Sequence, residues 1–245
     1  ARIPADLRIA KILLFGAIFK CLSPVLTIAA IMSAKSPFVS PMERREEART
    51  AREKFLTDRS DWMTDTKAYE MWGEAIGQGG RRAGMEFCEE NFLSFQTLQS
   101  ISDLRRQYRD ILVELGYVPE GYKAGADGGG AGVADMDLHS KDGRIVKAVI
   151  VAGLYPQVAR ISLPEKRFEE TAHGTVEVEC KPEEIRYYTP SDGRVFLHPS
   201  SINFTSTNYQ KDPFLMYLMK VETSTVFLRD STSVGVWPVL MFGGK

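Results

Sequence analysis

The first 118 residues place apolar and polar side chains at the spacing of amphipathic helices. Between residues 6 and 20, Leu7, Ala10, Leu14 and Ala17 recur every three or four positions, and the same spacing runs from residue 94 to residue 115. Such a period matches the turn of an α-helix with one face toward a core. The pattern predicts about six helices, over residues 6–20, 25–34, 42–55, 61–76, 81–92 and 94–115.

Helix boundary signals support this division. Ser23 followed by Pro24 predicts the start of the second helix, with Ser23 as the N-cap and Pro24 at the first helical position. The glycine-rich stretch 77–80 predicts the end of the fourth helix. Gly116 lies where a C-terminal glycine belongs after the long helix that begins behind Ser94.

The second half of the chain changes to short β-type runs. After a short helix predicted over 144–154, strands are predicted where β-branched and aromatic residues concentrate, with Thr223 and Ser224 as a tight turn between the last two. The predicted strands are 158–162, 175–180, 194–198, 214–221 and 225–229. Strands of this length and spacing indicate a small barrel or sandwich. The fold class is therefore α+β, a helical bundle followed by a small β-domain.

A glycine-rich insert separates the two patterns. Residues 119–143 contain G-A-D-G-G-G-A-G, which cannot bury a core and is typical of a flexible linker or a long surface loop. We therefore expect three parts: a helical domain at 1–118, the insert at 119–143 and a β-domain at 144–245. We expect residues 120–143 to be the most mobile part of the chain.

The composition of the chain excludes few classes of function. The chain has 44% hydrophobic and 26% charged residues with a formal net charge of -1, so the total charge does not indicate a nucleic-acid partner, although local patches decide binding. Cys21, Cys88 and Cys180 lack the paired spacing of a disulfide framework or a zinc site. We expect a reducing intracellular compartment, cytoplasmic or nuclear, with the mitochondrion left open.

No membrane partner is expected. Residues 12–32 are apolar, but Lys20 interrupts them and Ser23-Pro24 breaks them, so neither half reaches the roughly 20 residues that a span requires. Carboxylate pairs such as Glu46-Glu47 are adjacent and point in different helix directions, which excludes an acid/base dyad there.

The strongest candidate site follows the strand at 194–198. His198, Ser200, Ser201 and Asn203 place imidazole, hydroxyl and amide groups at a strand end, beside a proline that cannot continue a ladder. Such groups suit contacts with phosphate and ribose, including the 2'-hydroxyl. The alternative is a turn whose serines satisfy their own backbone. Thr223, in the turn between the last two strands, is a further nucleic-acid-binding candidate.

The long helix supplies a second candidate. Arg105 and Arg109 share one helix face, and Gln107 lies between them in sequence. A basic run of this kind is usually a solvated helix face, so phosphate binding and solvation both stay open. Aromatic residues on these helices are interpreted as core, with Trp62 the one that could instead stack a base.

The order of several short motifs resembles the C-terminal region of DEAH-box RNA helicases. In the first half these are the segment 6–30, K-S-P-F-V-S-P at 35–41, N-F-L-S at 91–94 and L-R-R-Q-Y at 104–108. In the second half they are A-G-L-Y-P at 152–156, F-L-H-P-S-S-I-N-F at 196–204 and F-L-R-D-S-T at 227–232. The resemblance implies a helicase-associated ratchet domain followed by an oligonucleotide-binding (OB) fold. It also implies that Arg105, Gln107 and the loop after residue 197 border an RNA channel.

The motor of such a helicase is missing from this chain. There is no G-x-x-x-x-G-K-[ST] phosphate loop and no D-E-A-H sequence, so we expect no cofactor here and no ATP hydrolysis by this chain alone. The resemblance implies ATP and Mg for motor domains of the same parent chain. Two functions follow as hypotheses: binding of single-stranded RNA, or docking of a regulatory protein or a ribonucleoprotein particle.

Overall fold

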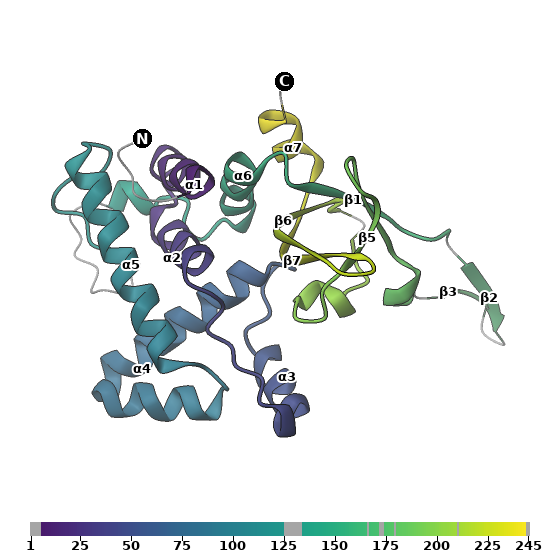
Figure 1. The fold of residues 1–245 in the computed structure, drawn as a ribbon, viewed down its shortest axis with the longest axis horizontal. Coiled ribbons are helices and arrows are strands. Elements are labelled where there is room, and N and C mark those ends of the chain that lie inside the picture. Colours follow the sequence, from purple (N-terminus) through teal and green to yellow (C-terminus); the bar gives the residue numbers. More distant parts are fainter. Residues whose placement is uncertain are drawn as a thin grey trace. The chain divides into compact units, whose positions relative to one another are not determined.

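The computed structural model describes residues 6–124, 134–165, 167–171, 174–178, 180–209 and 211–243. The chain divides into two compact units, Ala1–Gly153 and Leu154–Lys245. The first unit is helical and the second contains a β-barrel, as Figure 1 shows. The predicted α+β class, a helical bundle followed by a small barrel, is therefore confirmed.

The helices of the first unit follow the predicted pattern closely. They are α1 (Leu7–Ile18), α2 (Leu22–Ser33), the short η1 (Met42–Arg44), α3 (Arg45–Glu53), α4 (Asp61–Glu90), α5 (Phe95–Glu114), η3 (Ala134–Asp137) and α6 (Gly143–Leu154). Ser94 caps α5 as predicted, because its hydroxyl accepts a hydrogen bond from the Thr97 amide at 3.2 Å. Gly116 has φ 76, the left-handed conformation that a glycine behind a helix adopts.

Helix α2 forms the centre of the helical unit. It packs against α1, α4 and α5, and Figure 1 shows it among them. Leu22, Val25, Leu26 and Ile28 are fully buried, and Ala29 and Ala30 let neighbouring helices approach closely. A helix that is apolar around most of its circumference is expected to be buried on all sides. Trp62 is also core, with 2% of its surface exposed, so the interpretation of Trp62 as a base-stacking residue is wrong.

The predicted start of α2 is two residues late. The helix begins at Leu22 with Cys21 at the N-cap, so Ser23 and Pro24 lie inside the first turn. The Asp137 carboxylate accepts a hydrogen bond from the Ser23 amide at 2.7 Å. This partner lies 114 residues away in sequence, so the local sequence could not reveal it.

Helix α4 contains the predicted break. The element Asp61–Glu90 consists of two helices that meet at a kink, where Gly80 has φ 68 and ψ -163. This conformation is accessible to glycine and costly for other residues, so the glycine-rich stretch ends the first of the two helices, as predicted.

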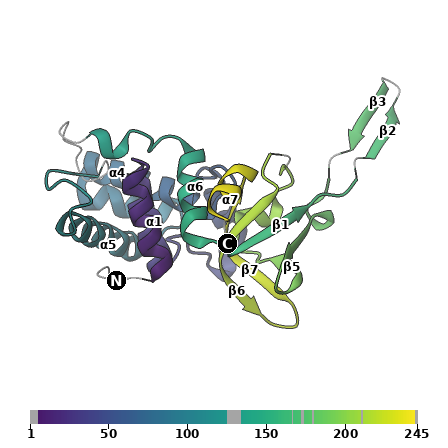
Figure 2. The ribbon, with the colours of Figure 1, turned by 90° about the horizontal axis from the view of Figure 1, so that it is seen from above.

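Helix α6 lies close to α1, and Figure 2 shows the two as neighbours. A Cβ atom added at Gly153 would lie 2.1 Å from Ile12 Cγ1 and 2.9 Å from the Arg8 carbonyl oxygen. Only a glycine permits this approach, which seals the buried Ile12 side chain under α6.

The second unit is built on a closed five-stranded barrel. The strand order is β1-β4-β5-β7-β6, with β5 and β7 parallel and the other pairs antiparallel. The strands are β1 (Val158–Ser162), β4 (Arg186–Thr189), β5 (Gly193–Leu197), β6 (Phe214–Glu222) and β7 (Val226–Val234). Alternate side chains fill the interior, including Ala159, Ile161, Val195, Leu215 and Leu228. This inward and outward alternation fixes which side chains face outward from the barrel.

Several elements of this unit were not predicted. The pair β2 (Arg167–Thr171) and β3 (Gly174–Val178) forms a separate two-stranded sheet, and only β3 was expected. Strand β4 is four residues long and gave too short a pattern to detect. Helix α7 (Val236–Phe242) and the short η4 (Pro182–Glu184) and η5 (Ile202–Thr205) were also missed.

The predicted insert includes residues 125–133, which lie outside the described residues, so its expected mobility stays a prediction. The described parts on either side are anchored. Tyr122 is buried, and its hydroxyl donates to the Asp137 carboxylate at 2.8 Å. Lys20 forms an ion pair with Asp135 at 2.7 Å. The compact units divide at Gly153–Leu154, behind α6, whereas the expected boundary lies before it at residue 144.

Candidate nucleic-acid interface

The loop behind β5 presents two of the predicted site residues at the surface. Ser200 is exposed and His198 is half-buried. His198 Nδ1 lies 2.7 Å from the Ser200 hydroxyl, and the Ser200 amide donates to the same nitrogen at 3.1 Å. An amide can donate only to an unprotonated ring nitrogen, so the neutral ring carries its proton on Nε2. The loop therefore offers one imidazole N–H donor and, because the Ser200 hydroxyl donates to Nδ1, one hydroxyl oxygen as an acceptor.

The surroundings favour this neutral form of His198. Burial lowers the pKa of the imidazole, and the positive charge of Arg229 lowers it further, while Asp230 acts in the opposite direction. At neutral pH the ring is an uncharged donor. This suits a hydrogen bond to a phosphate or ribose oxygen better than a long-range charge interaction.

Two other predicted residues lie beneath the loop. Ser201 has 5% of its surface exposed and Asn203 none. The Ser201 hydroxyl accepts from the Asn203 amide at 3.2 Å and lies 2.8 Å from the Ser231 hydroxyl on β7. The Asn203 side-chain amide donates to Ser231 Oγ at 2.9 Å, and the Tyr209 hydroxyl donates to the Asn203 carbonyl at 3.0 Å. This buried network holds the loop against the barrel.

The network also shows what the sequence interpretation missed. Ser231 and Tyr209 position the loop, but they lie 28 and 6 residues from Asn203, and neither carried a local signal. The alternative interpretation, serines that satisfy their own backbone, describes Ser201, whereas Ser200 remains exposed to a ligand.

Thr223 lies at the surface in the turn between β6 and β7. Its hydroxyl donates to the Thr225 carbonyl at 3.1 Å, so this side chain stabilises its own turn. A role of Thr223 in nucleic-acid binding stays a prediction.

The two predicted site residues of the helical unit, Arg105 and Gln107, differ in solvent exposure. Arg105 has 1% of its surface exposed; its guanidinium donates to the Tyr69 hydroxyl at 3.0 Å and to Ser23 Oγ at 3.3 Å. The same group lies 4.8 Å from the centre of the Tyr69 ring. Gln107 is exposed. Arg105 thus joins α5 to α4 and α2, and its predicted phosphate contact remains an untested hypothesis that this burial does not favour.

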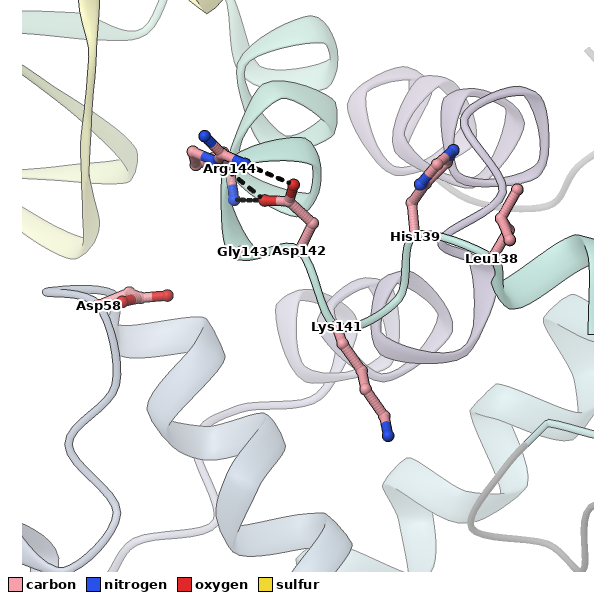
Figure 3. A pocket seen from close by; sticks show the side chains of 7 residues that line it. All are labelled: Asp58, Leu138, His139, Lys141, Asp142, Gly143 and Arg144. Atoms are coloured by element: carbon pink, nitrogen blue, oxygen red, sulfur yellow. Dashed lines mark hydrogen bonds and ion pairs between the residues drawn. The ribbon is translucent and has the colours of Figure 1, made fainter.

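An open hollow of about 560 Å³ lies in the helical unit at the start of α6 (Figure 3). Figure 3 shows His139 and Lys141 pointing in different directions, while Arg144 donates to Asp142 at 3.0 Å. The polar groups here pair with each other or diverge, so they form no acid/base constellation. Across the described ranges, no cluster of three or more His, Cys, Asp or Glu side chains could hold a metal ion.

In the described part of the chain, no helix is both long and apolar enough to cross a membrane.

The fold and the loop define a class of protein, a helicase-associated module with an OB barrel. Residues 146–245 match the family model of the oligonucleotide/oligosaccharide-binding (OB)-fold, and residues 6–67 match that of the ratchet-like helicase associated domain (HA2). The two matches occur in the order that the motifs predicted.

Named relatives make the assignment more specific. The chain is 39% identical over 253 residues to the putative ATP-dependent RNA helicase DHX57 of Mus musculus, covering 100% of this chain and 18% of the relative. It is 37% identical over 245 residues to the ATP-dependent DNA/RNA helicase DHX36 of Homo sapiens, covering 100% of this chain and 22% of the relative. It is 38% identical over 244 residues to the DExH-box ATP-dependent RNA helicase DExH1 of Arabidopsis thaliana, covering 99% and 21% respectively.

These matches confirm the predicted resemblance: the chain corresponds to the C-terminal region of DEAH-box RNA helicases. It spans about a fifth of the length of the curated relatives it matches.

Proposed function

We propose that this chain is the accessory C-terminal module of an ATP-dependent DEAH-box RNA helicase. It binds single-stranded RNA and helps to couple ATP-driven movement of motor domains in the same parent chain to translocation and unwinding. The observation that carries the proposal is the match of the whole chain to such helicases, with a ratchet-like domain followed by an OB barrel. ATP and Mg belong to the motor domains, in a reducing intracellular compartment.

The loop behind β5 supplies the chemistry for RNA contact. His198 offers an Nε2–H donor and Ser200 a hydroxyl, while the buried Asn203 network fixes the loop so that little ordering is needed on binding. The Nε2–H donor suits a phosphate oxygen, and the Ser200 oxygen, whose proton is directed to His198 Nδ1, can accept from the 2'-hydroxyl that distinguishes RNA from DNA. The loop therefore supports recognition of the RNA backbone rather than of base sequence.

Titration of labelled single-stranded RNA tests the proposal. His198→Ala combined with Ser200→Ala removes two neutral hydrogen bonds worth on the order of 1 kcal/mol each, so affinity should fall roughly tenfold or more. Ser100→Ala is the matched control, because this exposed hydroxyl on α5 donates only to the Gln96 carbonyl. It should bind RNA as the unaltered chain does. Ser201 is unsuitable for the test, because its loss would disturb the buried network.

Unchanged RNA affinity in the double variant, with a native melting curve, would contradict RNA contact by this loop. Absence of RNA binding by the unaltered chain at low salt, where phosphate contacts are strongest, would contradict the binding function itself. That second result would favour docking of a regulatory protein or a ribonucleoprotein particle.

A further inference from the structure

A second pocket of the helical unit lies beside the hollow of Figure 3. It has a volume of about 230 Å³ and shares Asp58, Lys141 and Gly143 with that hollow. Aliphatic side chains form part of its lining, among them Ile28, which is fully buried, and Val146, which leaves 1% of its surface exposed. Pockets for drug-sized ligands begin at roughly 300 Å³. The pocket therefore suits a single amino-acid side chain better than a nucleotide.

One face of α4 supplies polar groups to this pocket. The lining residues on α4 follow the pattern i, i+3, i+4 and i+7, so they lie on the same side of the helix: Met63, Thr66, Lys67 and Glu70. The pocket thus combines an aliphatic lining with a hydroxyl, an ammonium and a carboxylate from one helix.

The hydroxyl of Thr66 lacks a partner within the fold. Thr66 leaves 5% of its surface exposed, and its buried oxygen forms no hydrogen bond with any residue that the structure describes. A threonine inside a helix can donate to the carbonyl four residues earlier, which here belongs to Trp62. Buried polar groups are rarely left unpaired, because the loss of hydration then has no compensation. The Thr66 hydroxyl therefore indicates that the pocket receives a polar group.

Two carboxylates at the pocket are also unpaired. Neither Asp58 nor Glu70 forms an ion pair or a side-chain hydrogen bond with another described residue. Although Glu70 is exposed, the pKa of its carboxyl is raised, because desolvation opposes the charge more strongly than the positive charge of Arg105 favours it, and Glu74 acts in the same direction as desolvation. A cation at the pocket would compensate this carboxylate.

The lysines of the pocket do not supply that cation. The Lys67 ammonium donates to the Lys54 carbonyl at 2.9 Å. Figure 3 shows the Lys141 side chain directed away from Asp58. Neither ammonium is therefore paired with the two carboxylates.

The backbone holds Asp58 at the pocket in an unfavourable conformation. Asp58 has φ 49 and Arg59 has φ 50, a left-handed conformation that is costly for residues other than glycine. The Asp58 carboxylate lies against Gly143, where an added Cβ atom would collide with it. Strained residues of this kind concentrate at binding sites, where the surrounding structure compensates their cost.

We propose that this pocket receives the side chain of an arginine from a protein partner. The aliphatic stem lies on Ile28 and Val146, and the guanidinium donates to the Thr66 hydroxyl and to the unpaired carboxylates. A guanidinium fits better than an ammonium, because its planar set of N–H donors matches a carboxylate in two hydrogen bonds. The carboxylates repel phosphate, so the occupant is a protein segment and not RNA. This inference goes beyond the proposed RNA-binding function and does not depend on it.

NMR titration of the isotope-labelled 245-residue chain tests the pocket with two small probes. N-acetyl-arginine methylamide carries the guanidinium, and N-acetyl-citrulline methylamide has nearly the same shape without the charge. The arginine probe should shift the amide signals of Thr66 and Val146, with at least about fivefold higher affinity than the citrulline probe. Glu70→Gln should weaken binding of the arginine probe about tenfold and leave binding of the citrulline probe unchanged. Glu74→Gln is the matched control, because Glu74 lies one turn further along α4 and does not line the pocket.

A pair of threonine variants tests the unpartnered hydroxyl. Thr66→Val should weaken binding of the arginine probe about fivefold without lowering the free energy of unfolding, because no hydrogen bond within the fold is lost. Thr64→Val should lower the free energy of unfolding, since the Thr64 hydroxyl accepts from the Thr57 amide at 3.1 Å. Equal destabilisation by the two variants would show that Thr66 has a partner within the fold and would overturn the proposal.

The remaining outcomes separate this pocket from other occupants and from the proposed function. Equal affinity for the two probes would show an apolar pocket that does not select a cation, and the absence of shifts with both would leave the pocket to solvent; either result overturns the proposal. Displacement of the arginine probe by single-stranded RNA would assign the pocket to RNA and overturn a protein occupant. Native binding of the arginine probe by a chain that fails to bind RNA would support the pocket while contradicting the RNA-binding function.

Discussion

Arg105 shows how burial changes the role of a charged residue. The sequence places it in a basic run, but its guanidinium is enclosed and shared between the Tyr69 hydroxyl and ring and the Ser23 hydroxyl. The neighbours in that run differ: Arg106 is exposed and pairs with Asp103 at 2.9 Å. A buried cation with fixed partners contributes to folding, while an exposed ion pair contributes little.

We expect Arg105→Ala to lower the free energy of unfolding by on the order of 2–3 kcal/mol, because it leaves the Tyr69 hydroxyl without this donor and opens a cavity. Chemical denaturation measures the loss. Arg106→Ala is the control and should cost less than about 1 kcal/mol. A native melting curve for Arg105→Ala, combined with a salt slope for RNA binding lowered by about 0.7, would instead restore the predicted phosphate contact.

His198 is the residue whose protonation should report on the loop. Its pKa lies below the ordinary value of 6.5, first because of burial and second because of Arg229. Folding therefore favours the neutral ring: the contribution to stability is complete above the ordinary pKa and is lost as the pH falls through the lowered value. Protonation also removes the acceptor for the Ser200 amide.

NMR titration should place the imidazole pKa of His198 below 6.5 in the folded chain. Arg229→Gln should raise this pKa, because it removes the positive charge that opposes protonation. Arg160→Gln, which also removes a barrel arginine, serves as the control and should leave the His198 pKa where it was. An unchanged pKa in Arg229→Gln would show that Arg229 does not act on the ring.

At the scale of elements, the described parts of the insert are held by one carboxylate. Asp137, inside the insert, accepts hydrogen bonds from the Ser23 amide at 2.7 Å, the Ser140 hydroxyl at 2.6 Å and the Tyr122 hydroxyl at 2.8 Å. It therefore connects the start of α2 with two described segments of the insert. Asp135, two residues earlier, forms only an exposed ion pair with Lys20.

We expect Asp137→Ala to destabilise the helical unit by about 1–2 kcal/mol or more, because a helix-terminal amide and two hydroxyls lose their acceptor. Thermal melting measures the effect. Asp135→Ala should shift the melting temperature little, since an exposed ion pair is worth less than about 1 kcal/mol. Equal effects of the two substitutions would contradict the anchoring role of Asp137.

Deletion of residues 125–132 should leave the melting temperature nearly unchanged. Glycine dominates this stretch, which therefore cannot bury a core, and the anchors at Tyr122 and Asp137 lie outside the deletion. A loss of several degrees would show that the deleted residues pack against the helical unit.

The success of sequence-based prediction depended on how local the cause of each feature was. Helix α5 was predicted well because its apolar stripe, its Ser94 cap and Gly116 lie within or beside it. The start of α2 was misplaced because Asp137, which accepts a hydrogen bond there, lies 114 residues away in sequence. The candidate site also depended on a distant contact. Ser200 and Ser201 are adjacent and identical in sequence, and only the contact of Ser201 with Ser231 on β7 distinguishes the buried Ser201 hydroxyl from the exposed Ser200 hydroxyl.

At the scale of the whole molecule, the net charge does not reveal how the charged side chains are distributed over the surface. A total of -1 gives no indication of a polyanion partner, yet the register of four strands gathers four arginines on one outer face. The alternation of R-Y-Y-T at 186–189 and R-V-F-L at 194–197 carries this signal, but strand β4 was not predicted, so the arginines could not be placed on one face. The distribution of charge over the surface therefore becomes evidence for function only when the strand topology is known.

The proposed coupling of motor movement to RNA gives a prediction for the parent helicase. The loop behind β5 belongs to no nucleotide site, since the sequence contains no phosphate loop. In a polypeptide that joins this chain to its motor domains, His198→Ala combined with Ser200→Ala should therefore reduce unwinding several-fold more than basal ATP hydrolysis. The physical reason is that weaker binding lets the RNA move relative to this module during motor closure, while the residues that hydrolyse ATP are unchanged.

Parallel assays of strand separation and phosphate release measure the ratio of unwinding to ATP hydrolysis, with Ser100→Ala as the control. Equal loss of both activities would mean that the loop acts on the motor itself, and native unwinding with reduced RNA affinity would mean that this contact holds RNA without transmitting movement.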